Sequence, residues 1–122
     1  MKTSGVALVG RADPVRVQLA RYLRDSGFDV LECDELALPQ RFAGAVVMDD
    51  GDSSSPTVHK RVQAWIHAGT PRRVVVVSPR PAGWRALALA HPERVWVLAA
   101  PAFGWQIVDA LRASSLDEPQ GA

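Results

Sequence analysis

Five short apolar runs recur along the chain, and most of their positions are occupied by valine, alanine or leucine rather than by alternating apolar and polar residues. They lie at Val6–Val9, Phe28–Leu31, Ala45–Met48, Val74–Val77 and Val95–Leu98. Near-continuous runs of this kind are typical of strands in a parallel sheet, because helices cover such a sheet on both faces. The pattern therefore predicts five parallel strands.

Two of the segments between these runs carry clear helix signals. One begins at Asp13-Pro14 and ends at Gly27, and the other begins at Ser55-Pro56 and ends near Gly69. In both, a capping residue precedes proline at the first helical position, and glycine follows the last turn. Apolar residues at helical spacing predict the buried face of each helix. In the first helix they are Val15, Leu19, Tyr22 and Leu23, and Arg16, Arg21 and Arg24 lie outside this stripe. In the other helix they are Val58, Val62, Trp65 and Ile66.

Three further helices complete the pattern. We expect a helix of one or two turns within Asp34–Phe42, where Pro39 limits its length, and another near Gly83–Ala90. The last helix begins after Pro101. Its predicted core positions are Phe103, Ile107 and Leu111.

Strict alternation of strands and helices predicts a single α/β domain, a doubly wound (βα)5 parallel sheet with strand order 2-1-3-4-5. We assign residues 1–115 to this domain and residues 116–122 to a flexible tail or the start of a linker. In such sheets the working site lies at the carboxyl ends of the strands, beside the point where the strand order reverses. The residues that follow the first, third, fourth and fifth strands are therefore the candidates for function.

Composition narrows the class of protein. The 122 residues include 14 Lys+Arg, 13 Asp+Glu and a single cysteine, Cys33. A formal net charge of +1 gives no argument for a nucleic-acid binder. A lone cysteine cannot form an internal disulfide, and no apolar run is as long as a membrane span or the core of a signal peptide. We expect a small cytoplasmic domain that does not contact a membrane.

The end of the third strand carries a cluster of carboxylates, Asp49, Asp50 and Asp52. Clustered carboxylates suit a hard cation or a phosphoryl acceptor, although Asp50 and Asp52 also suit a turn that caps the next helix. Asp49 directly follows the buried run, so we expect it to project into the site. We expect Arg11, after the first strand, to pair with this cluster, and Ser78, ending the fourth strand, to donate a hydrogen bond to a phosphoryl group or to the backbone.

The chain resembles the receiver domain of two-component response regulators from Val6 to about Ala113. The resemblance is carried by Leu23-Arg24-Asp25-Ser26-Gly27-Phe28-Asp29-Val30, by Val46-Val47-Met48-Asp49, by Val75-Val76-Val77-Ser78, and by Pro101 after the last strand. It implies a flavodoxin-like fold and a role in signalling. In receivers, two acidic residues after the first strand hold Mg²⁺, an aspartate ending the third strand accepts the phosphoryl group, and a Ser/Thr and a lysine contact that group.

The resemblance also implies which of these groups the chain has kept. It places the acidic pair on Gly10 and Arg11, the acceptor on Asp49, the hydroxyl on Ser78, and the lysine on Ala100, before Pro101. The acceptor and hydroxyl are present, whereas the metal ligands and the lysine are missing. Mg²⁺ neutralises charge on a transferring phosphoryl group, so the loss of its ligands implies that Asp49 no longer acts as a phosphorylation switch. The resemblance thus implies a degenerate pseudo-receiver that has no enzymatic activity, metal or other cofactor, and that stands alone or begins a response regulator or transcription factor.

A second resemblance supplies an alternative. The run from Val6 to Gly10, followed by a helix and by Asp34, is similar to the opening of a dinucleotide-binding domain, with Asp34 as the ribose-binding acid. The Gly-x-Gly-x-x-Gly fingerprint requires two further glycines, and Ala12 and Val15 stand there instead. The alternative is therefore a degenerate Rossmann-type nucleotide-binding domain.

Charge is distributed unevenly: residues 25–52 hold eight acids and one arginine, whereas residues 53–94 hold seven Lys/Arg and one glutamate. Such asymmetry orients a protein partner or a second subunit, and no motif for nucleic-acid recognition accompanies it. Trp105 lies outside the core stripe of the last helix, and Trp84 begins the fourth. Tryptophans near arginines are typical of interfaces. We therefore expect partner binding or self-association through the fourth helix, fifth strand and fifth helix, a face that receivers commonly use to dimerise.

Overall fold

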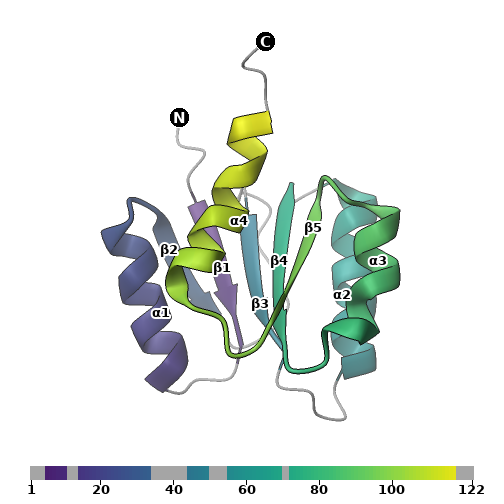
Figure 1. The fold of residues 1–122 in the computed structure, drawn as a ribbon, viewed down its shortest axis with the longest axis horizontal. Helices are drawn as coiled ribbons and strands as arrows, with labels where there is room; N and C mark the ends of the chain where they lie inside the picture. The colour runs from purple at the N-terminus through teal and green to yellow at the C-terminus, as the bar shows by residue number, and fades with distance from the viewer. Residues whose placement is uncertain (1–4, 11–13, 34–43, 50–54, 70–71, 118–122) are drawn as a thin grey trace.

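The computed structural model describes residues 5–10, 14–33, 44–49, 55–69 and 72–117. Its five strands form one parallel sheet in the order β2-β1-β3-β4-β5 (Figure 1). The strands are β1 (Gly5–Val9), β2 (Asp29–Cys33), β3 (Gly44–Met48), β4 (Arg73–Ser78) and β5 (Val95–Ala99). The predicted sheet type and strand order are both confirmed.

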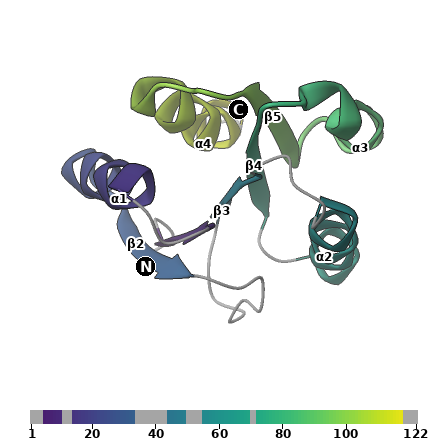
Figure 2. The same cartoon turned by 90° about the horizontal axis from the view of Figure 1, so that it is seen from below.

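The helices cover the sheet on both faces, as Figure 2 shows. One face packs against α1 (Pro14–Asp25) and α4 (Gly104–Asp117). The other packs against α2 (Ser55–Ala68), the 3₁₀ turn η1 (Pro81–Trp84) and α3 (Arg85–Ala90). The helix expected within residues 34–42 lies outside the described residues.

Successive residues of a strand point to opposite faces of the sheet, and this alternation divides the buried side chains into two separate cores. On the central strands, Val46 and Val75 belong to the core under α1 and α4, whereas Val47 and Val76 belong to the core under α2 and α3. Both sets are buried, which explains why β1, β3 and β4 are apolar without alternation. The edge strands β2 and β5 are only partly buried, and β2 accommodates polar residues such as Asp29.

The end of α1 follows the sequence prediction. Gly27 has a φ of 103°, the left-handed conformation that glycine adopts without steric cost. Its N–H donates to the Arg24 carbonyl, and the N–H of Phe28 donates to the Leu23 carbonyl, which is the Schellman pattern of helix termination. This arrangement turns the chain directly into β2.

The buried face of α1 differs from the predicted stripe. Its buried residues are Arg16, Leu19, Ala20 and Leu23. Leu19 and Leu23 were predicted correctly, but Val15 and Tyr22 are exposed. The helix is rotated toward Arg16 and Ala20 because the Arg16 guanidinium has polar partners at the sheet edge. Sequence periodicity treats every arginine as a surface residue and therefore misplaces the stripe.

The predicted faces of the other helices are largely correct. Val62, Trp65 and Ile66 are buried beneath α2. Ile107 and Leu111 are buried beneath α4, but the prediction for Phe103 is wrong, because this residue precedes the helix and is exposed. Helix α4 continues to Asp117, while residues 118–122 lie outside the described residues, so the assignment of a tail at residues 116–122 remains a prediction.

Candidate functional site

The strand ends that the sequence singles out meet at one edge of the sheet, at the bottom of Figure 1. Backbone hydrogen bonds hold the residues just beyond β1, β3 and β5. The N–H of Gly10 donates to the Cys33 carbonyl at 3.0 Å, that of Asp49 to the Val77 carbonyl at 2.8 Å, and that of Ala100 to the Ser78 carbonyl at 2.8 Å. The structure therefore brings Gly10, Asp49, Ser78 and Ala100 to one edge, as the parallel sheet predicts. Arg11 and Asp50 lie outside the described residues.

Asp49 is the centre of a buried hydrogen-bond network. Its side-chain oxygen Oδ2 accepts a hydrogen bond from Ser78 Oγ at 2.9 Å and another from Trp84 Nε1 at 3.0 Å. Asp49 is 8% exposed, and Ser78 is fully buried. The Ser78 hydroxyl oxygen also accepts the N–H of Arg80 at 3.0 Å, which ties the loop after β4 to the same network. A buried carboxylate with two donors on one oxygen is held in a fixed orientation.

Trp84 corrects the predicted interface. Its side chain is 1% exposed, so the expectation that it lies on an exposed interaction surface is wrong. The physical reason is that residues 81–84 form a 3₁₀ turn before α3, and this turn directs the indole inward onto Asp49. A buried indole N–H requires an acceptor, and Asp49 supplies it. His59 of α2 stacks on the indole with ring centroids 3.7 Å apart and an interplanar angle of 19°.

Arg16 is a site residue that the sequence analysis missed. It lies in the first turn of α1 and is 9% exposed. Its guanidinium donates to the carbonyls of Gly10 at 2.9 Å and Cys33 at 3.2 Å, and to Glu32 Oε1 at 3.2 Å. These contacts place a buried positive charge at the carboxyl ends of β1 and β2. The feature that could have revealed it is Glu32, an acid near the carboxyl end of the edge strand β2.

Gly10 leaves no room for a side chain. A Cβ atom added there would lie 3.0 Å from the Cβ of Met48, closer than side chains normally approach. This position is the one at which the resemblance expects an acidic metal ligand, and a side chain there would press on the side chain of Met48.

Ala100 and Pro101 line an apolar cavity of about 630 Å³ between α1 and the start of α4. Ala100 packs against the core beneath these helices, so an apolar methyl group occupies the position at which the resemblance expects a lysine. Phe103 borders the same cavity and stacks with Trp105, with ring centroids 6.3 Å apart. Trp105 is 57% exposed, as the sequence predicts. This pair forms an exposed aromatic surface at the start of α4.

Other chemistries find no support in the part of the chain that the structure describes. Within the described ranges, no helix is long and apolar enough to span a bilayer, and no three His, Cys, Asp or Glu side chains gather as metal ligands would. The strand order 2-1-3-4-5 also differs from the 3-2-1-4-5 order of the dinucleotide-binding fold, so the sheet does not support the Rossmann alternative.

Comparison with known proteins finds the same fold in solved response-regulator structures. No family model and no curated protein sequence matches the chain. Among solved structures, a response regulator receiver protein from Sinorhizobium medicae WSM419 superimposes with a TM-score of 0.66 and 15% identity, covering 93% of this chain and 94% of its own. A sensor protein from Polaromonas sp. JS666 gives 0.68 and 19%, covering 93% of this chain and 97% of its own.

A third neighbour is a response regulator from Burkholderia pseudomallei whose structure contains a phosphorylated aspartic acid, a calcium ion and citrate. It superimposes with a TM-score of 0.62 at 18% identity, over 97% of this chain and 73% of its own. At these identities the likeness shows a shared fold.

Proposed function

We propose that the chain is a receiver-like signalling module that acts through protein contacts, without catalysis and without an aspartyl phosphate as its switch. The observation that carries the proposal is the pair of hydrogen bonds that Asp49 Oδ2 accepts from Ser78 and Trp84. In this arrangement the hydroxyl that would contact a phosphoryl group and the indole both hold the carboxylate itself. Asp49 then serves as a buried structural acceptor that joins β3, β4 and η1.

The described residues around Asp49 do not fit a divalent cation. Gly10 has no side-chain oxygen to offer, and a larger residue there would press on Met48. The nearby strand ends carry the Arg16 guanidinium, a positive charge that opposes a metal ion at the same edge. Ala100 supplies no positive charge for a phosphoryl group. These features support a module that does not depend on phosphorylation.

The first test is incubation with acetyl phosphate and Mg²⁺ followed by intact-mass spectrometry. We expect no phosphoryl adduct. Asp49→Ala and the exposed Asp109→Ala serve as matched variants, because an adduct on the wild type that persists in both would be unspecific. A stoichiometric adduct that disappears only in Asp49→Ala would refute phosphorylation independence.

The contact surface that we propose is the face of α3, β5 and α4, now centred on Trp105 and Phe103 because Trp84 is buried. Two stacked, exposed aromatic rings supply the large apolar contact that interface centres use. Trp105→Ala should weaken self-association or partner binding in sedimentation velocity while the melting temperature stays within a few degrees of wild type. The matched control is Leu31→Ala, which removes an exposed apolar side chain from β2 at the opposite edge of the sheet. Equal weakening by both variants would contradict the assignment.

A further inference from the structure

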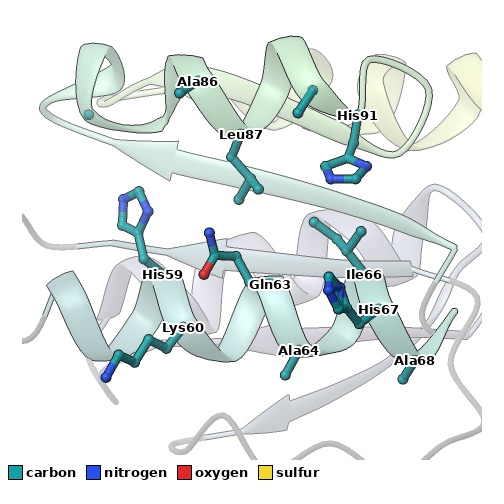
Figure 3. Close-up of a pocket in the computed structure, with 12 residues that line it drawn as sticks. His59, Lys60, Gln63, Ala64, Ile66, His67, Ala68, Ala86, Leu87 and His91 are labelled. Carbon is teal, nitrogen blue, oxygen red and sulfur yellow. The ribbon is translucent and has the colours of Figure 1, made fainter.

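A groove with a volume of about 1060 Å³ runs between α2 and α3, on the sheet face opposite α1 and α4. Figure 3 shows His59, Gln63 and Ile66 pointing from α2 toward α3, and Leu87 and His91 pointing back from α3. Ile66 and Leu87 are buried and form an apolar floor. Short side chains line the remainder of the groove, among them Ala64, Ala68, Ala86 and Ala90.

Among the described residues that line this groove, Lys60 is charged and none is Asp or Glu. Residues 55–91 contain six Lys/Arg and three His but no Asp or Glu. All three histidines of the chain, His59, His67 and His91, line the groove, and Lys60 joins them. The acids of the chain gather elsewhere, chiefly within residues 25–52. A segment of negative charge is therefore the occupant that this surface complements.

We propose that the groove between α2 and α3 docks an acidic segment of a partner protein. The segment would place apolar side chains on Ile66 and Leu87 and carboxylates beside Lys60 and the histidines. The apolar floor favours a peptide over a nucleic acid, since phosphates gain nothing from it. Among the described lining residues there is no arginine, the residue best suited to phosphate, and the neighbouring Trp84 is buried rather than open to a base. This surface is separate from Trp105, so the inference goes beyond the proposed function.

The groove is connected to the Asp49 network through one side chain. His59 forms part of the groove wall and stacks on Trp84, whose Nε1 donates to Asp49. A segment that enters the groove touches His59 and so changes the surroundings of the Trp84 indole. That indole N–H is therefore a built-in reporter of occupancy, and the indole of Trp105 on α4 is its internal control.

The experiment is a ¹H–¹⁵N NMR titration of the full chain with a short peptide of alternating Glu and Leu. We expect the Trp84 indole signal to shift on binding while the Trp105 signal does not, and we expect a peptide with Gln in place of Glu to bind more weakly. Absence of a Trp84 shift would overturn the proposal. A DNA duplex that moves the same signal at lower concentration than the peptide would also overturn it, in favour of nucleic acid.

Variants separate docking in the groove from general charge attraction. Lys60→Glu should weaken peptide binding by about fivefold or more, which corresponds to about 1 kcal/mol. Arg21→Glu, an equal charge change on exposed α1, should leave affinity within about twofold. Ala86→Leu fills the groove without changing charge and should also weaken binding. If Arg21→Glu weakens binding as much as Lys60→Glu, or if Ala86→Leu has no effect, the peptide does not dock in the groove.

Discussion

Replacing Trp84 by phenylalanine isolates the hydrogen bond that holds Asp49. The substitution keeps an aromatic ring beneath His59 but removes the N–H that donates to Asp49 Oδ2 at 3.0 Å. Loss of a buried hydrogen bond to a carboxylate costs about 1–3 kcal/mol, and the smaller ring adds about 1 kcal/mol of lost packing. We therefore expect the free energy of unfolding to fall by about 2–4 kcal/mol and the melting temperature to fall by about 10 °C.

The assay is urea unfolding followed by circular dichroism, combined in a double-mutant cycle with Asp49→Ala. Each single variant breaks the same bond, so the double variant should lose about 1–2 kcal/mol less than the sum of the two. Trp105→Phe is the matched control and should change stability by no more than about 0.5 kcal/mol, since its ring is exposed. Additive losses in the cycle, or wild-type stability in Trp84→Phe, would refute the reasoning about Asp49.

Two further substitutions test the geometry around the site. Arg16→Met keeps the buried stem but removes the guanidinium that donates to the Gly10 carbonyl and to Glu32, so urea unfolding should show a loss of about 2–4 kcal/mol. The exposed Arg21→Met should be nearly neutral, and a neutral Arg16→Met would contradict the capping role. Gly104→Ala would place a Cβ atom against the ring of Tyr22 and should lower the free energy of unfolding by about 1–2 kcal/mol. This loss of stability should vanish when Tyr22 is replaced by alanine. A loss that persists in the Tyr22→Ala background would show that the clash is not its cause.

The sheet could be predicted from sequence because its signals are local and repeated. Val-rich runs mark the strands, and the connectivity of parallel strands leaves few topologies open. The same logic brings Asp49 and Ser78 together, since both end strands that are neighbours in the sheet. Their hydrogen bond follows from topology and from the length of two short side chains.

The positions of Trp84 and Arg16 could not be predicted in the same way. The orientation of Trp84 depends on a single 3₁₀ turn, and apolar periodicity carries no information about such a turn. The burial of Arg16 depends on carbonyls from two strands that become neighbours only after the sheet forms. Both residues donate to partners on other elements, Trp84 to Asp49 and Arg16 to Glu32, and apolar periodicity does not predict such contacts.

Side chains alternate between the two faces of the sheet along the central strands, so the helices on one face can change without disturbing those on the other. A substitution at Val46 disturbs packing under α1 and α4, whereas one at its neighbour Val47 disturbs packing under α2 and α3. Mutations that reshape one layer of helices are therefore buffered from the other by the sheet between them. The two contact surfaces that we propose, the Phe103–Trp105 pair and the groove between α2 and α3, lie over opposite faces of the sheet and can consequently change one at a time.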